Sequence, residues 1–510
     1  MINTLILYIR MLITVGISLY STRLVLNALG AKDFGIYNLI AGIVSMMAFV
    51  NLSMTTATQR YLSFHQGKND PNMQKKVFSN SLLLHLLIGT AVILALEVGG
   101  PFFFSGFLKI PMERIDAAKI IYHYMVISIF ITIISSPFTG ILMAHENMLW
   151  VAVVNIVEVL LRLSVAVYMY KIHTDVLIFY GWTMVGVSAI STLMYIVFCF
   201  KEYKECTFRM AGNFDRPLIK ELSSFAGWNL FGAACGVGRA EAIAVILNIF
   251  FGTVINAAYG IANQVSNQMK FFSASLLRAM DPQIMKSEGA QNRKRMLRLS
   301  MLASKYGFFL LAFISIPCIF EMPLILKFWL KNVPDYTIVF CRLTLIAIMA
   351  NQLTIGLQSG LQATGKIKAY QAVVGSIQLL NPLIAFLLLK IGSPAYSVLI
   401  SIIAIELVAC VFRIYFLKKL AGMSVKEYFK MVLLRELIPV FTAVLTCVLI
   451  VSFVHMPYRF LLTISVSATL FIIAVYFTGM EDDEKGHLKV LKEGFRSRIV
   501  LFKMSMFKFF

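Results

Sequence analysis

The fold is decided by two similar stretches of sequence, LNALGAKDFGIYNLIAGI at residues 26–43 and LNIFFGTVINAAYGIANQ at residues 247–264. They align at an offset of about 222 residues, which pairs Gly30 with Gly252. In each half of the chain, the stretch spans the junction between the first apolar segment and the second apolar segment. The match predicts two six-helix bundles in a parallel repeat. Because short matches between apolar helices also arise by chance, the repeat is a hypothesis for the structure to test.

The composition of the whole chain is that of a membrane protein. Of its 510 residues, 59% are hydrophobic and 14% are charged, and the mean hydropathy is +0.80. Soluble globular proteins are about 45–50% apolar and about 25% charged, so this composition excludes a soluble enzyme. At about 20 residues per span plus short connectors, the chain accommodates about fourteen transmembrane helices. The sequence therefore predicts an all-α polytopic membrane protein, with two C-terminal helices after the two bundles.

The division of the chain follows from the repeat and from the charged loops. The N-terminal apolar stretch contains Arg10 and is too long for a signal peptide, so we interpret it as a retained first helix. The expected units are an N-terminal six-helix bundle (1–200), a cytoplasmic basic linker (201–220), a C-terminal six-helix bundle (221–420), two extra transmembrane helices (421–480) and a basic amphipathic cytoplasmic tail (481–510).

The formal net charge of +21 is distributed unevenly along the chain. Lys and Arg concentrate in the loops after the even-numbered spans and in the C-terminal tail, whereas the other loops carry few. By the positive-inside rule, both termini are expected in the cytoplasm. The loops on the other side are short, which disfavours a membrane-embedded glycan polymerase or ligase. We therefore expect a multi-pass transport protein and no enzyme.

Several motifs are absent from the sequence. It contains no GxxxxGK[ST] phosphate-binding loop and no HExxH or comparable metal-ligand spacing. The acidic run at residues 481–484 follows the last span, and we interpret it as a solvated helix end, with metal binding as the weaker alternative. We expect no cofactor, no metal site and no nucleic acid as a partner.

Basic residues within the predicted spans are the strongest functional signal. A charged side chain at the centre of a bilayer costs about 2.5–3.5 kcal/mol on insertion scales, so each should face a cavity or a partner. Arg239 and Lys270 lie deepest, each about 24 Å from the start of its span at about 1.5 Å per residue. The candidates for a cationic substrate-binding cavity are Arg10, Arg23, Arg60, Arg239, Lys270 and Arg278. For those near span ends, anchoring at the lipid headgroups is the alternative.

Acidic residues in the spans are fewer. Glu158 and Arg162 are spaced i, i+4, which predicts an ion pair on one helix face. Glu406 has no local partner, so it meets a basic residue across the bundle or takes part in proton coupling. The candidates for ion coupling or ion pairing are Glu158, Arg162, Glu241 and Glu406.

Asparagine and glutamine side chains recur along predicted spans seven to eleven. They could donate hydrogen bonds to sugar hydroxyls, and bonds between helices are the alternative role. These residues are Asn229, Asn248, Asn263, Gln264, Asn267, Gln268, Asn351, Gln352, Gln358, Gln362, Gln371, Gln378 and Asn381.

Two segments resemble a known family. Residues 3–64 contain an Arg in the first helix, a TR-x-x-L-x-x-LG stretch and a DFGIY turn, and are similar to the opening of the bacterial O-antigen and polysaccharide flippases. EMPLILKFWLKNVPDYT, residues 321–337, resembles the P-x-I-L-x-x-W-L segment of that family. These flippases form the polysaccharide-transport branch of a superfamily that also contains the multidrug and toxin extruders and the lipid II flippase.

The resemblance implies a function. It implies passage of an undecaprenyl-diphosphate-linked oligosaccharide, for O-antigen (lipopolysaccharide), capsule or another surface polysaccharide, across the bacterial inner membrane by alternating access of two lobes. The cavity cations of the family correspond to Arg10, Arg23, Arg60 and Arg239, whereas Lys270 and Arg278 rest on position alone. The expected partners are the lipid-linked oligosaccharide, membrane lipids, and a polysaccharide polymerase with its chain-length regulator.

Two alternatives within transport remain open. The fourteen expected spans match the lipid II flippase better than many polysaccharide flippases, which keeps lipid II as an alternative cargo. A cation-coupled multidrug extruder of the same superfamily is the other, although such extruders generally need membrane-embedded carboxylates.

Overall fold

The chain folds into helices throughout the residues that the structure describes. A computed structural model describes residues 2–45, 48–104, 110–207, 212–330 and 332–486. These ranges contain helices and no strand, and eleven of the helices are long and apolar enough to cross a membrane. The prediction of an all-α polytopic membrane protein is therefore confirmed.

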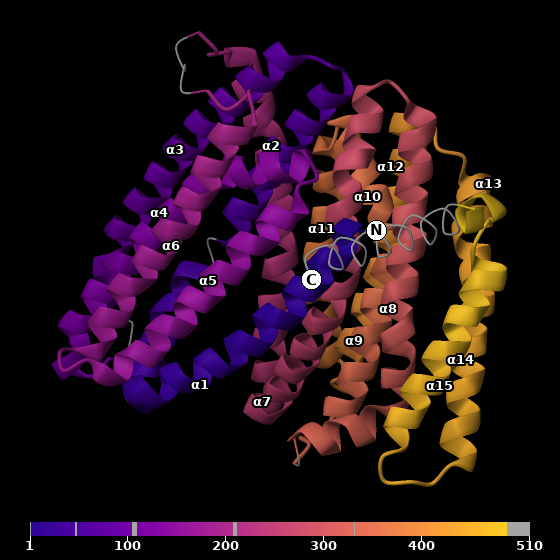
Figure 1. Ribbon diagram of the computed structural model, residues 1–510. Helices are drawn as coiled ribbons and strands as arrows, with labels where there is room; N and C mark the ends of the chain where they lie inside the picture. Colours follow the sequence, from indigo (N-terminus) through magenta and orange to yellow (C-terminus); the bar gives the residue numbers. More distant parts are fainter. Residues whose placement is uncertain (1, 46–47, 105–109, 208–211, 331, 487–510) are drawn as a thin grey trace, which may run out of the picture.

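The helices form two bundles and a flanking pair. The N-terminal bundle consists of α1 (Ile2–Ser45), α2 (Ala48–Gly67), α3 (Pro71–Phe102), α4 (Ile115–Ala144), α5 (Met148–Tyr168) and α6 (Val176–Glu202). The C-terminal bundle consists of α7 (Arg216–Gly289), α8 (Arg293–Leu330), α9 (Thr337–Gln352), α10 (Ile355–Thr364), α11 (Lys368–Lys390) and α12 (Ser397–Ala421). The short α13 (Val425–Tyr428) leads into α14 (Leu434–Phe453) and α15 (Arg459–Ala474), which lie on the outer side of the C-terminal bundle (Figure 1).

Two of these helices are each interrupted at a single glycine. Gly30 in α1 has φ 72° and ψ 166°, and Gly252 in α7 has φ 77° and ψ −168°. Both values fall in a backbone region that is essentially restricted to glycine. Each glycine therefore joins two helices at a kink, and α7 covers two predicted spans. The glycines paired in the two matching sequences thus have the same backbone conformation, as a repeat requires.

The ends of several helices are fixed by capping side chains. The carboxylate of Asp70 accepts a hydrogen bond from the backbone N–H of Met73 at the start of α3. Asp215 caps the start of α7 in the same way through Leu218. These caps satisfy donors that the first turn of a helix leaves unpaired.

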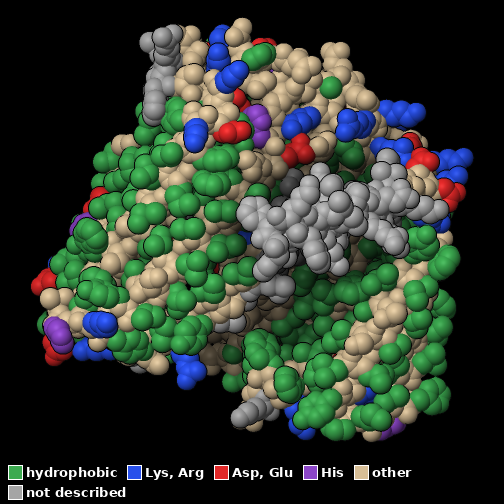
Figure 2. Space-filling view, viewed as in Figure 1, with side chains coloured by type: hydrophobic (Ala, Val, Ile, Leu, Met, Phe, Trp, Pro, Cys, Tyr) green, Lys and Arg blue, Asp and Glu red, His purple; other side chains and the backbone are tan. Residues whose placement is uncertain are grey.

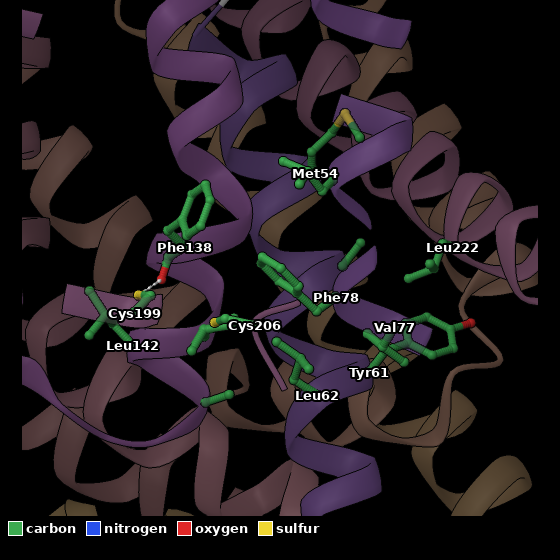
Figure 3. Packing of buried hydrophobic residues seen from close by; sticks show 14 of the residues in the cluster. Met54, Tyr61, Leu62, Val77, Phe78, Phe138, Leu142, Cys199, Cys206 and Leu222 are labelled. Atoms are coloured by element: carbon green, nitrogen blue, oxygen red, sulfur yellow. Dashed lines mark hydrogen bonds between the residues drawn. The ribbon is translucent and has the colours of Figure 1, made fainter. Parts of the chain in front are cut away.

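The first turns of α7 pack against the N-terminal bundle. Figure 3 shows a buried apolar cluster that contains residues of α2, α3, α4 and α6 and, at its edge, Leu222 of α7. Further along α7, Ile243 and Leu247 belong instead to an apolar cluster of the C-terminal bundle. The helix α7 therefore passes from one bundle to the other. Among the labelled residues of the first cluster are Met54, Leu62, Val77, Phe78, Phe138 and Leu142.

The surface has a belt of apolar side chains between two charged ends (Figure 2). We call the end at which α2 and α7 terminate, at Gly67 and Gly289, the basic end, because the Lys- and Arg-rich loops lie there. The other end carries Arg114, which binds Asp175 and also Asp33 of the DFGIY segment, a segment that is helical and belongs to α1. The two bundles meet at the basic end and diverge toward the other (Figure 1).

The acidic run after the last span is not solvated throughout. Glu484 is buried, and its carboxylate oxygens lie 2.7 and 2.8 Å from the Nζ atom of Lys305, which is 0% exposed. The interpretation of a solvated helix end was therefore wrong for Glu484, although the side chain of Asp482 is fully exposed. Most of the predicted amphipathic tail, residues 487–510, lies outside the described residues, and the predicted unit boundaries stay predictions.

Candidate substrate cavity

A cavity of about 250 Å³ lies where α1 and α5 of the N-terminal bundle approach α7. We call it the arginine cavity. Figure 2 shows that the surface is hollowed between the two bundles. The residues that line the arginine cavity are Arg10, Thr14, Ser18, Asn155, Glu158, Val159, Arg162 and Phe271.

The arginine cavity has an excess of positive charge. Glu158 and Arg162 form the expected ion pair, with Nη2 of Arg162 2.7 Å from Oε1 of Glu158. Arg10 is buried, and no carboxylate within the described ranges lies at ion-pair distance from it. The Nε atom of Arg10 has no hydrogen-bond partner among the described atoms. Arg278 lies within electrostatic range of Arg10 but also of Asp281, so Arg10 is the cation of this cavity that has no ion-pair partner among the described residues.

A second charged cluster lies inside the C-terminal bundle. Nη1 of Arg239 on α7 is 2.7 Å from Oε1 of Glu406 on α12, and Nδ2 of Asn351 on α9 donates to Oε2 of Glu406 at 2.6 Å. Lys270 lies within electrostatic range of this pair. Arg239 is therefore the basic partner of Glu406. It lies across the bundle, far from Glu406 in the sequence.

Comparison with known proteins agrees with this architecture. Residues 7–168 match a protein-family model described as MatE. A MATE structure in the bent conformation superposes with a TM-score of 0.72 at 13% identity, covering 82% of this chain and 97% of that one. The chain has the fold of the MATE transporters.

Two further solved structures share this fold at low identity. A MOP superfamily transporter from Pyrococcus furiosus has a TM-score of 0.66 at 13% identity, covering 82% of this chain and 95% of that one. The MATE transporter ClbM in complex with Rb⁺ has a TM-score of 0.68 at 12% identity, covering 84% of this chain and 95% of that one. No curated protein matches the chain in sequence.

Arg60 lies away from the arginine cavity in this MATE fold. Its Nη2 atom donates to the backbone oxygen of Ala363 on α10 at 3.0 Å. Its guanidinium carbon lies 4.4 Å from the ring centre of Tyr61 and 4.7 Å from that of Phe64. Arg60 is therefore buried in the contact between the two bundles, where it bonds to the protein itself.

The remaining predicted site residues are dispersed. Arg23 is exposed further along α1 and lines neither of the two cavities described for this fold. Glu241 is exposed on α7, and it forms no ion pair within the part of the chain that the structure covers. Of the six basic candidates, Arg10 alone lines the arginine cavity as described, with Arg278 within electrostatic range of it, and Arg239 and Lys270 lie beside Glu406.

A second cavity, of about 210 Å³, lies between α2 and the helices α7, α10, α11 and α12. We call it the amide pocket, because five of its lining side chains are carboxamides from the polar set noted in the sequence. The amide-pocket carboxamides are Asn229, Gln358, Gln362, Gln371 and Gln378.

Sequence reasoning did not select Arg413 and Tyr370, which also line the amide pocket. Nε of Arg413 donates to the hydroxyl of Tyr370 at 3.4 Å, and Nη1 donates to Oγ1 of Thr354 at 3.1 Å. Arg413 follows Glu406 by seven residues on the same helix, and this spacing places both on one face. That spacing was the available signal. No cluster of three or more potential metal ligands occurs in the residues described.

Proposed function

We propose that the chain is a transporter that moves an undecaprenyl-diphosphate-linked oligosaccharide, the repeat unit of a surface polysaccharide, across the bacterial plasma membrane. The observation that carries the proposal is the unneutralised Arg10 in the arginine cavity between the bundles. A diphosphate supplies the negative charge that this site lacks. Guanidinium groups bind phosphate oxygens through paired, charge-assisted hydrogen bonds.

The contact between the bundles supports transport by alternating access. At the basic end, α2 and α7 approach so closely that a Cβ atom at Gly289 would collide with the backbone oxygen of Phe64. The carboxylate of Glu146 accepts hydrogen bonds from Gln283 and Lys286 of α7, each at 2.6 Å. With the basic end assigned to the cytoplasm by the positive-inside rule, this arrangement corresponds to a state closed to the cytoplasm.

A cation-coupled multidrug extruder is the second candidate, because two structural neighbours are MATE transporters and one of them, ClbM, binds Rb⁺. An extruder of cations needs a free carboxylate in its cavity, whereas Glu158 and Glu406 are both ion-paired with arginines. The transporter from Pyrococcus furiosus is described as having a binding pocket of reverse polarity that suggests a different function. Pockets of different charge therefore occur on this fold, and the positive cavity favours an anionic cargo.

The test is translocation by the purified chain in proteoliposomes. One set of vesicles carries a fluorescent, short-chain polyprenyl-diphosphate disaccharide in the outer leaflet, and a second set is given the cationic dye ethidium. We expect the chain to make the lipid probe inaccessible to a membrane-impermeant quencher faster than protein-free vesicles do, and to leave ethidium unmoved. Ethidium transport without movement of the lipid probe would establish the extruder instead.

A further inference from the structure

The amide pocket lies between the two bundles and is separate from the arginine cavity, with which it shares no lining residue. Ser53 and Thr56 of α2 line one side of it, and α7, α10, α11 and α12 supply the rest. Asn229 on α7 is buried and belongs to its lining. Nε2 of Gln371 and Nε2 of Gln362 both donate to Oδ1 of Asn229, at 3.1 and 3.4 Å.

The hydrogen-bonding capacity of these carboxamides is only partly used. Nδ2 of Asn229 is buried and has no hydrogen-bond partner in the described part of the chain. The side chains of Gln358 and Gln378 are half-buried in the lining and form no hydrogen bond with another described residue. If these residues served only to join helices, their donors and acceptors would be paired with each other, because an unpaired buried polar group costs about 1–3 kcal/mol.

The chemistry of the lining favours a neutral, hydroxyl-rich ligand. Each carboxamide offers two donors and an acceptor, and each sugar hydroxyl can donate and accept at the same time. Among the described residues, no carboxylate lines the pocket and Arg413 is its one cation. Arg413 already donates to Tyr370 and Thr354. At about 210 Å³, the pocket is smaller than the clefts of about 300–1,000 Å³ that hold drug-sized ligands, so it suits about one sugar ring of a longer chain.

We propose that the amide pocket is a carbohydrate-binding subsite that holds one ring of the cargo oligosaccharide through Asn229, Gln371 and their neighbouring carboxamides. This inference rests on the proposed function, because it assigns the sugar part of the cargo to one site and the diphosphate to another. The arginine cavity then provides affinity for any polyprenyl diphosphate, and the amide pocket distinguishes glycans.

Two glycines on α7 offer a matched pair of variants. A Cβ atom at Gly232 would collide with Oε1 of Gln371, so Gly232→Ala pushes this carboxamide into the pocket. A Cβ atom at Gly236, one turn further along the same helix, would lie 3.7 Å from Oε1 of Gln378, which is an ordinary van der Waals distance. Both substitutions make the same chemical change, and only the first alters the pocket.

The test compares the binding of two probes to the purified full-length chain. Farnesyl diphosphate presents the diphosphate alone, and a farnesyl-diphosphate-linked disaccharide presents diphosphate and sugar. We expect the wild-type chain to bind the disaccharide probe about tenfold more tightly, equivalent to one or two net hydrogen bonds. Gly232→Ala and, separately, Asn229→Leu should reduce this ratio to about one with farnesyl diphosphate affinity unchanged, and Gly236→Ala should retain it.

The outcomes separate the two proposals. An unchanged ratio in both Gly232→Ala and Asn229→Leu would overturn the carbohydrate subsite. A wild-type chain that binds both probes equally would overturn it as well, and would leave the proposed function standing. A wild-type chain that binds neither probe would overturn the proposed function and the assignment of the pocket together. Retained affinity for farnesyl diphosphate shows that each variant is folded.

Discussion

Nη1 of Arg239 lies 2.7 Å from Oε1 of Glu406, in an ion pair that joins α7 to α12. The carboxylate is almost completely buried, and Asn351 binds its second oxygen. Arg239 therefore neutralises a charge of the protein itself and links α7 to α12 within the C-terminal bundle. Arg10 has no ion-pair partner among the described residues, and it is the cation that we propose binds an anionic cargo.

Removing Arg239 should destabilise the chain. In Arg239→Ala the buried Glu406 loses its partner, and breaking a buried pair in this way costs about 3–5 kcal/mol. We expect a large drop in the unfolding temperature in detergent. In a Glu406→Gln background the same substitution should cost much less. Glu241→Ala, two residues along the same helix at an exposed position, is the control and should change little. If Arg239→Ala lowered the unfolding temperature equally in the wild-type and the Glu406→Gln chain, the result would contradict the pairing of Arg239 with Glu406.

The glycine kinks should tolerate no side chain. Gly252→Ala and Gly30→Ala each place a Cβ atom on a backbone with φ near +75°, at a cost of about 1–3 kcal/mol. In the described part of the chain, no atom from outside the local backbone lies within 4 Å of either added Cβ, so the loss is conformational and not a steric clash. Thermal unfolding in detergent measures it. Gly260→Ala, in a helical part of α7 with equally open surroundings, should be neutral or stabilising. A kink glycine that behaved like Gly260 would disprove the assignment.

The pair Lys305–Glu484 should anchor to α8 the segment that follows the last span. Tyr306 donates a further hydrogen bond to the same carboxylate at 3.0 Å. Glu484→Gln removes the carboxylate that forms the ion pair with the fully buried Lys305, and we expect a loss of about 3–5 kcal/mol in stability. Asp482→Asn, in the same acidic run but fully exposed, should have almost no effect on the unfolding temperature. Similar effects of the two substitutions would show that the pair is unimportant.

The end opposite the basic end should be sensitive to acid. Burial raises the pKa of Asp175, but hydrogen bonds from Arg114 and from the backbone of α6 outweigh it and leave the pKa below its ordinary value of 3.8. A lowered pKa stabilises the fold above the ordinary value, and this stability is lost as the pH falls through the lowered value. Asp175→Asn should therefore reduce the unfolding temperature at pH 7 more than at pH 3. Asp116→Asn, at an exposed position at the same end, is the control and should change the unfolding temperature little. If Asp175→Asn lowered the unfolding temperature equally at pH 7 and pH 3, the ionised carboxylate of Asp175 would not be the source of this stability.

How much the sequence revealed depended on how far apart the interacting residues lie in the chain. Composition and span length predicted the helical membrane fold, and the i, i+4 spacing predicted the pair Glu158–Arg162. Arg239 and Glu406 are separated by 167 residues, so no periodicity could join them. The sequence therefore ranked Arg239 as a free cavity cation, and the structure shows that it is paired.

The amide pocket shows the same limit. Its carboxamides come from α7, α10 and α11, and each is individually indistinguishable from one that joins two helices. Arg60 could be placed near the end of its span from sequence, but its contact with Ala363 crosses between the bundles and depends on how they close. The burial of Glu484 likewise depends on its contact with Lys305 of α8, which is distant in the sequence.

The leaflet in which the lipid-linked repeat unit accumulates tests the central claim most directly. The measurement is made in a bacterial strain that lacks this chain and carries the wild type, Arg10→Ala or Arg23→Ala. Arg23→Ala is the matched control, because it removes the same charge from the same helix at a position that lines neither cavity. We predict inner-leaflet accumulation without the chain and with Arg10→Ala at normal protein level, and export with the wild type and Arg23→Ala. Accumulation of single repeat units in the outer leaflet of the deletion strain, or full export by Arg10→Ala, would contradict the account.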